Sequence, residues 1–114
     1  MSGRLRRSAL APWTGVFMGA LAWFGHHQLA SNAVYYDCRS GGPWLTAGLG
    51  LLAALVTVAG ALISWRSRSI APSNPDRPET RSVAGAIGAM TAAIFLVAIG
   101  FQSLSGFLIP ACFR

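Results

Sequence analysis

Three long uncharged segments, separated by short clusters of charged residues, dominate the pattern of the chain. Counting histidine as neutral, no charge falls within residues 8–36, 40–65 or 82–113. A helix rises 1.5 Å per residue, so roughly 20 residues cross about 30 Å of hydrocarbon, and each segment exceeds that length. Within lipid the backbone must pair internally, which helices and closed barrels achieve, and three strands cannot close a barrel. The pattern therefore predicts three transmembrane helices.

We expect an all-α membrane protein with a single transmembrane domain over residues 1–114. The helices are predicted at about residues 12–36, 43–66 and 82–109, and residues 67–81, which contain three prolines, are predicted to form a solvated loop. A proline stands at the start of each of the first two helices, where its missing N–H costs nothing, and another proline follows the third helix.

The composition agrees with this interpretation. Of 114 residues, 54% are apolar and 11% are charged, whereas an ordinary soluble domain is about 25% charged. The mean hydropathy is +0.51. These values argue against an independent soluble enzyme, a disordered tail or a coiled coil. The net charge of +6 is divided among separate segments rather than gathered on one surface, so we expect membrane lipid and no nucleic acid as a partner.

Arginine is distributed unequally between the two sides of the predicted helices. One side carries Arg4, Arg6, Arg7, Arg66, Arg68, Arg77 and Arg81, whereas the other carries Arg39 and Arg114. Because positively charged segments stay in the cytoplasm, we expect a cytoplasmic N-terminus and a periplasmic C-terminus in a bacterial inner membrane. Aromatic belts are then predicted at the inner interface (Trp13 and Trp65) and at the outer interface (Tyr35, Tyr36 and Trp44).

A cleaved signal peptide is a second interpretation of the N-terminus. The basic residues Arg6 and Arg7, the apolar run and the small residues Ala20 and Ala22 fit such a signal in part. The apolar run continues through bulky aromatic residues to Tyr36, which favours a retained first helix.

Small residues recur along one face of each predicted helix. The second helix has such a stripe at Thr46, Gly50, Ala53, Thr57, Gly60 and Ser64, opposite a stripe of Leu45, Leu49, Leu52, Val56 and Ile63. The first helix carries Gly15, Gly19, Ala22, His26 and Ala33, and the third carries Gly85, Ala89, Ala92, Ser103 and Gly106. Because helices in lipid associate by close backbone approach, the small faces are predicted to pack together and the leucine stripe to face lipid.

Three polar residues fall inside the predicted spans: His26 and His27 on the first helix and Gln102 on the third. The structural interpretation is an interhelical hydrogen bond from an imidazole to Gln102, a serine or a backbone carbonyl. The functional interpretations are contact with a partner, a proton relay, or a haem or metal ligand. A bis-histidine haem would need a histidine on another helix, which the chain lacks, and Met18 and Met90 lie in the other leaflet, so we expect no metal or cofactor.

Two cysteines, Cys38 and Cys112, follow the first and third helices on the predicted periplasmic side. That compartment is oxidising, so a disulfide between them is expected. No catalytic motif, phosphate-binding loop or metal-ligand cluster accompanies them, and the three acidic residues all fall in predicted loops. We therefore expect a protein that is not an enzyme, and the absence of a carboxylate inside the spans argues against an ion-coupled transporter.

Several short segments carry a family resemblance: Ala22-Trp-Phe-Gly-His-His-Gln-Leu-Ala-Ser, Cys38, Ser64-Trp-Arg66, Phe101-Gln-Ser-Leu and Ile109-Pro-Ala-Cys-Phe-Arg114. They resemble a group of small three-helix proteobacterial membrane proteins that are encoded beside haem–copper terminal oxidase and oxidase-assembly genes. The resemblance implies an accessory or assembly role in a respiratory complex, with larger membrane subunits as partners, and no biochemical activity. The alternative is a self-contained haem- or metal-binding protein, or a small homo-oligomeric transport protein, that uses His26 and His27.

Overall fold

The computed structural model is an all-α bundle of three long helices. It describes residues 10–36, 42–68 and 78–109. The described elements are η1 (Ala11–Trp13, a single 3₁₀ turn), α2 (Thr14–Tyr36), α3 (Pro43–Arg66) and α4 (Pro78–Leu108). The all-α architecture and the three helices that the sequence predicted are thus confirmed in the described part of the chain.

Prolines mark the beginnings of the helices. Pro43 opens α3, where the N–H groups of Leu45 and Thr46 both bond to the carbonyl of Gly42. α4 begins at Pro78, one turn earlier than the expected Ser82, so the loop predicted over residues 67–81 is wrong in its last turn. Proline is favoured in the first helical turn because its φ is preset and its missing N–H has no partner to lose. The last of the three loop prolines therefore starts a helix instead of extending the loop.

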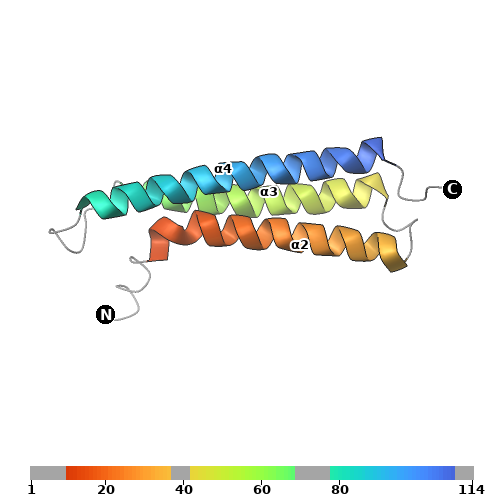
Figure 1. Cartoon of the computed structure of the whole chain (residues 1–114), viewed down its shortest axis with the longest axis horizontal. Helices are drawn as coiled ribbons and strands as arrows, with labels where there is room; N and C mark the ends of the chain where they lie inside the picture. Colours follow the sequence, from red (N-terminus) through yellow and green to blue (C-terminus); the bar gives the residue numbers. More distant parts are fainter. Residues whose placement is uncertain (1–9, 37–41, 69–77, 110–114) are drawn as a thin grey trace.

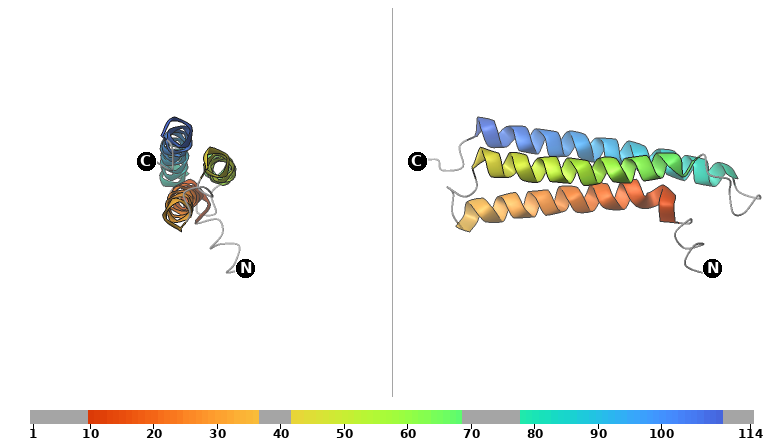
Figure 2. Two further views of the ribbon diagram at one scale, coloured as in Figure 1. Left: turned by 90° about the vertical axis from the view of Figure 1, so that its right-hand side faces the viewer. Right: turned by 180° about the vertical axis from the view of Figure 1, so that it is seen from behind.

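Successive helices are antiparallel, so that the chain reverses direction twice and α2 and α4 run in the same direction (Figure 1). Each helix packs against both of the others, and seen along its axis the bundle is triangular (Figure 2, left). The start of α2, the end of α3 and the start of α4 share one end of the bundle. The end of α2, the start of α3 and the end of α4 share the opposite end.

The buried face of α3 consists of small residues. The residues buried on this helix are Thr46, Gly50, Ala53, Thr57, Gly60 and Ser64, the same six that form the small-residue stripe of the sequence. In the opposite stripe Leu45, Leu52, Val56 and Ile63 are exposed, and Leu49 is half-buried. α3 therefore turns its small side chains toward α2 and α4 and most of its large ones outward.

All three helices meet at Gly15 of α2, Ser64 of α3 and Gly88 of α4. The N–H of Gly15 donates to the hydroxyl of Ser64 at 2.7 Å, and Ser64 is fully buried. A Cβ on Gly15 would collide with the carbonyl oxygen of Gly88, and a Cβ on Gly88 would lie 3.1 Å from Ser64 Cβ. Backbone therefore packs directly on backbone at this point, which no larger residue permits.

Two further glycines receive side chains from a neighbouring helix. A Cβ on Gly60 would lie 2.8 Å from Cβ of Met18, and a Cβ on Gly19 would lie 2.8 Å from the ring of Phe95. One turn before Gly60 on α3, Thr57 is fully buried, and its hydroxyl donates to the carbonyl of Ala53 at 2.8 Å. The close approach of the helices thus extends along the bundle beyond the contact of Gly15, Ser64 and Gly88.

Two of the three long helices are long and apolar enough to cross a membrane. These segments are Pro43–Arg66 and Ser82–Leu108, with mean hydropathies of 2.1 and 2.2 in their most apolar windows. Only 28% of each window is buried in the bundle, whereas the core helix of a soluble protein is mostly buried. α2 does not reach the same hydropathy because its second half contains His26, His27, Gln28 and Asn32.

The glycine contact predicts a difference between two alanine substitutions. Gly15→Ala is expected to lower the free energy of unfolding by about 1–3 kcal/mol, because the added methyl group meets backbone that cannot move independently. Gly100→Ala meets nothing within 4 Å and is expected to be neutral or to stabilise by up to about 1 kcal/mol through helix propensity. Unfolding in mixed detergent–SDS micelles, followed by circular dichroism, measures both; equal effects would contradict the close approach.

Candidate functional site

His26 is buried between α2 and α3, with 3% of its surface exposed. Its Nε2 lies 3.2 Å from the carbonyl oxygen of Thr46. A carbonyl oxygen accepts only, so Nε2 carries the proton and donates. Nδ1 is then buried without a hydrogen-bond partner in the part of the chain that the structure describes. His26 therefore joins the middle of α2 to the first turn of α3.

Gly50 of α3 lies beside the imidazole of His26 and directly against Ser103 of α4. A Cβ on Gly50 would lie 3.4 Å from Cε1 of His26 and would collide with the hydroxyl of Ser103 on α4. One turn closer to the start of α3, Thr46 packs on Gly106, where an added Cβ would lie 3.1 Å from Thr46 Cγ2. Polar groups of all three helices thus occupy one layer of the bundle.

His27 lies at the edge of this layer and bonds to α4. Nε2 of Gln102 is 2.7 Å from Nδ1 of His27, the shortest contact between two polar side chains in the layer. The exposed imidazole of His27 stacks on Trp23 with ring centroids 5.8 Å apart and planes inclined by 12°. Trp23 in turn contacts Phe95 of α4 at a centroid distance of 6.2 Å. Aromatic rings therefore cover one side of the hydrogen bond between α2 and α4.

The amide of Gln102 has two usable orientations toward His27. With its nitrogen toward Nδ1, it donates to the bare ring nitrogen and leaves Oε1 buried without a partner in the described residues. With its oxygen toward the ring, it accepts from a protonated Nδ1. The pair is therefore compatible with either tautomer of the imidazole.

The structure places the three polar residues predicted from the sequence in one layer but divides them into two pairs. His26 takes a backbone carbonyl, one of the partners considered, and His27 rather than His26 takes Gln102. The role of the Thr46 carbonyl has no sequence signal, because every residue has a carbonyl and only the helix packing decides which one receives a second donor. Ser103, which the sequence places on the small-residue face of the third helix and near Gln102, meets Gly50 of α3 directly.

The chemistry that this layer supports is hydrogen bonding between helices. Adjacent residues of a helix diverge by about 100°, and His26 and His27 accordingly point to different neighbours. Among the described residues no three of His, Cys, Asp and Glu lie close enough together to hold a metal ion. The layer fixes the rotation of α2 relative to both other helices.

The predicted packing residues line the interior. Gly15, Gly19, Gly50, Thr57 and Gly60 are all buried. Cys38 and Cys112, predicted to form a disulfide, lie outside the described residues. The helices that precede these cysteines, α2 and α4, end on the same side of the bundle (Figure 1).

The face of α2 that points away from the bundle changes character along the helix. In chain order the residues along this face are Phe17, Leu21, Phe24, Gln28, Ser31 and Asn32, and Leu29 and Val34, which flank its second half, are also exposed. The first half of this face is therefore apolar, and the second half presents amide and hydroxyl groups. We call Gln28, Ser31 and Asn32 the polar face of α2.

Exposed aromatic residues stand at both ends of the bundle. Trp13 and Trp65 lie near one end, and Tyr35 and Trp44 lie near the other. Trp44 packs edge-to-face on Phe107 of α4 with ring centroids 5.9 Å apart. Two separated levels of exposed aromatic residues are typical of the interfaces of a membrane protein.

In comparisons with known proteins, no protein family, curated protein or solved structure matches the chain.

The contact between His27 and Gln102 predicts a measurable coupling. His27→Ala, Gln102→Ala and the double variant form a double-mutant cycle. The sum of the two single losses should exceed the double loss by about 0.6 kcal/mol, the average for side-chain hydrogen bonds in a membrane bundle, and by at most about 1.7 kcal/mol. Unfolding in mixed micelles provides the four free energies. A coupling of zero would show that the two side chains do not interact.

Proposed function

We propose that the chain is a non-enzymatic integral protein of a bacterial inner membrane that serves as an accessory or assembly subunit of a larger respiratory complex. All three helices cross the membrane, with the N-terminus in the cytoplasm and the C-terminus in the periplasm. The arginine distribution supports this orientation. Seven of the nine arginines come, along the sequence, before α2 or between the end of α3 and the first turn of α4, and these helix ends share one end of the bundle.

The observation that carries the proposal is the polar face of α2. In a chain surrounded by lipid alone, the outward face of a spanning helix is apolar until it reaches the interface. Gln28 precedes Tyr35 by about two helical turns, or roughly 10 Å along the axis, so its amide lies well below the outer aromatic belt. An exposed amide at that depth indicates a polar neighbour that the bundle itself does not supply.

Energetics favour a protein rather than lipid as that neighbour. Moving an amide or a hydroxyl into hydrocarbon without a hydrogen-bond partner costs about 4–8 kcal/mol, whereas a bond to a second helix returns part of that cost. Gln28, Ser31 and Asn32 each contain both donors and acceptors and lie within about one and a half turns. They match a partner helix that carries small polar residues at the same depth.

The internal packing agrees with a docking role. The small-residue stripe of α3 is buried, and Gly15, Gly19 and Gly88 of the other two helices are in contact within the bundle, so these residues are not the surface left for a partner. The remaining outward surfaces of α3 and α4 are rich in exposed leucine, isoleucine, valine and phenylalanine, which suit lipid. The polar face of α2 is thus distinguished from the rest of the exterior by its chemistry.

The respiratory partner is proposed from the resemblance of the sequence to membrane proteins encoded beside terminal oxidases. On this account the chain binds large oxidase subunits through α2 and stabilises their assembly. It performs no step of the oxidase reaction.

The test is co-purification of the tagged full-length protein in mild detergent, with oxidase subunits identified by mass spectrometry. The double variant Gln28→Leu, Asn32→Leu should fold normally and retain less than about one tenth of the partner, because two interhelical hydrogen bonds at about 1 kcal/mol each correspond to a factor of about 30. The matched control is Phe17→Leu, Leu21→Val, which alters the apolar half of the same outward face and should leave the partner bound.

A deletion strain should contain less assembled oxidase, while each remaining complex turns over at a normal rate. The proposal is wrong if the purified chain carries no oxidase subunit. It is also wrong if the isolated protein binds haem stoichiometrically, or transports a solute in liposomes without a partner.

A further inference from the structure

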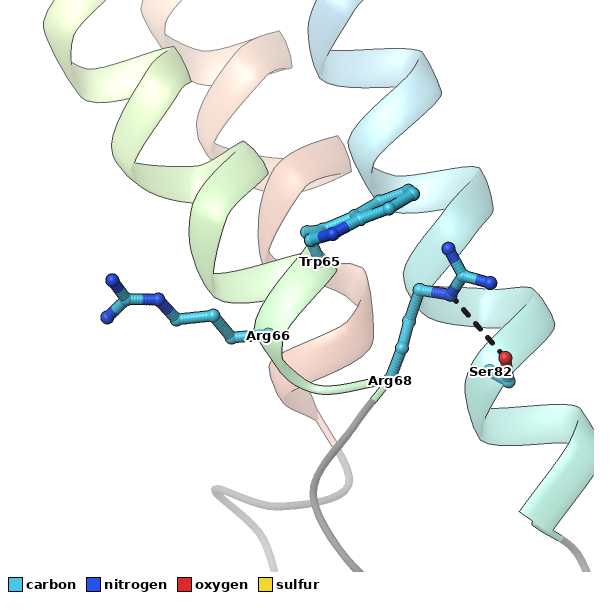
Figure 3. Close-up of a pocket in the computed structure, with 4 residues that line it drawn as sticks. All are labelled: Trp65, Arg66, Arg68 and Ser82. Carbon is cyan, nitrogen blue, oxygen red and sulfur yellow. Dashed lines mark hydrogen bonds between the residues drawn. The ribbon is translucent and has the colours of Figure 1, made fainter.

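A cavity at the end of the bundle where α3 ends combines positive charge with an exposed aromatic ring. It has a volume of about 350 Å³, opens to the surroundings, and is lined by Trp65, Arg66, Arg68 and Ser82 (Figure 3). Sites for small organic ligands begin at about 300 Å³, so the cavity is large enough for a headgroup-sized molecule.

The guanidinium of Arg68 is held in place from several directions. Its carbon lies 4.4 Å from the centroid of the Trp65 ring, and its Nε donates to the hydroxyl of Ser82 at 3.4 Å (Figure 3). The backbone N–H of Arg68 bonds to the carbonyl of Trp65 at 3.2 Å. Gly85 of α4 leaves room for the aliphatic part of the Arg68 side chain, since a Cβ on Gly85 would lie 2.6 Å from Arg68 Cγ. Arg68 is therefore preorganised across the gap between α3 and α4.

The atoms of Arg68 that remain available suit a phosphate. Nε is engaged with Ser82, so the four N–H groups on the two Nη nitrogens form the free fork of the guanidinium. Such a fork donates two parallel hydrogen bonds to phosphate oxygens, which a lysine ammonium does not. Arg66 lines the same cavity from the last turn of α3 and adds a second positive charge, although its side chain extends away from Arg68 in Figure 3.

The helix dipoles do not set the sign of the electrostatic potential in the cavity. The carbonyl end of α3 and the amide end of α4 meet near it, and their partial charges of about half a unit oppose each other. The full positive charge of Arg68, with Arg66 lining the same opening, therefore gives the cavity a preference for an anion.

The position of the cavity selects a lipid over a soluble anion. α3 has 24 residues, or about 36 Å, so its end passes the 30 Å hydrocarbon layer and reaches headgroup depth. Trp65 and Leu62 are 55% and 52% exposed and lie on one face of α3, which gives the acyl chains an apolar surface beside the charged cavity. From this geometry we propose that the cavity formed by Trp65, Arg66, Arg68 and Ser82 binds the phosphate headgroup of an anionic phospholipid.

The experiment is native mass spectrometry of the full-length protein released from detergent, titrated with phosphatidylglycerol or with phosphatidylcholine of the same acyl chains. The wild-type protein should retain phosphatidylglycerol with a clear preference. Arg68→Gln should weaken that binding by about tenfold or more, the effect of losing a hydrogen bond to a charged group. Arg68→Lys should also weaken it several-fold, because the charge remains but the fork is lost.

The matched control is Arg39→Gln, which removes the same charge from the sequence between α2 and α3, far along the chain from the cavity. It should bind phosphatidylglycerol like the wild type, and circular dichroism should show equal helix content in all variants. Ser82→Ala, which removes only the hydroxyl that orients Nε, should give a smaller loss than Arg68→Gln.

Three results would overturn the proposal. Equal binding of both lipids would remove the selectivity for an anionic headgroup. Full retention by Arg68→Gln or Arg68→Lys would show that overall charge, rather than this cavity, holds the lipid. Displacement of the lipid by millimolar inorganic phosphate would identify a site for a soluble anion instead.

Discussion

Close backbone approach at glycine is the constraint on which the rest of this bundle depends. Lipid tails are as apolar as leucine side chains, so helices in a membrane gain little free energy by moving large apolar side chains from lipid into a helix interface. They associate instead through dispersion contacts, which require short interaxial distances. The contact of Gly15, Ser64 and Gly88 meets that requirement at one end of the bundle. The contact of Gly50 with Ser103 meets it toward the other end.

The polar residues depend on this packing for their geometry. With the helices packed at this distance, the imidazole of His26 reaches the Thr46 carbonyl on α3, and the same rotation of α2 turns His27 toward Gln102 on α4. The same rotation directs Gln28, Ser31 and Asn32 outward. The interior contacts thus determine which polar groups are left for a partner, and Gly85 similarly lets Arg68 cross to Ser82 at the opposite end.

Much of this arrangement could be predicted from the sequence because charge and side-chain size follow the helix period. The uncharged segments predicted the positions of the three helices, and the spacing of small residues predicted which face of α3 is buried. The start of α4 at Pro78 was not predicted, since proline signals both a loop and a first helical turn. The pairing of His27 with Gln102 and the stacking of Arg68 on Trp65 depend on the relative rotation of helices, which no single helix pattern contains.

The most direct test of the account is whether α2 crosses the membrane despite its polar second half. Single-cysteine variants Ser2→Cys and Ser40→Cys, in a full-length background with Cys38→Ser and Cys112→Ser, can be labelled in spheroplasts with a membrane-impermeant maleimide. The account predicts that Ser40→Cys is labelled in intact spheroplasts and that Ser2→Cys is labelled only after the membrane is permeabilised. Labelling of both positions from the same side would show that α2 does not span the bilayer and would contradict the three-helix membrane bundle.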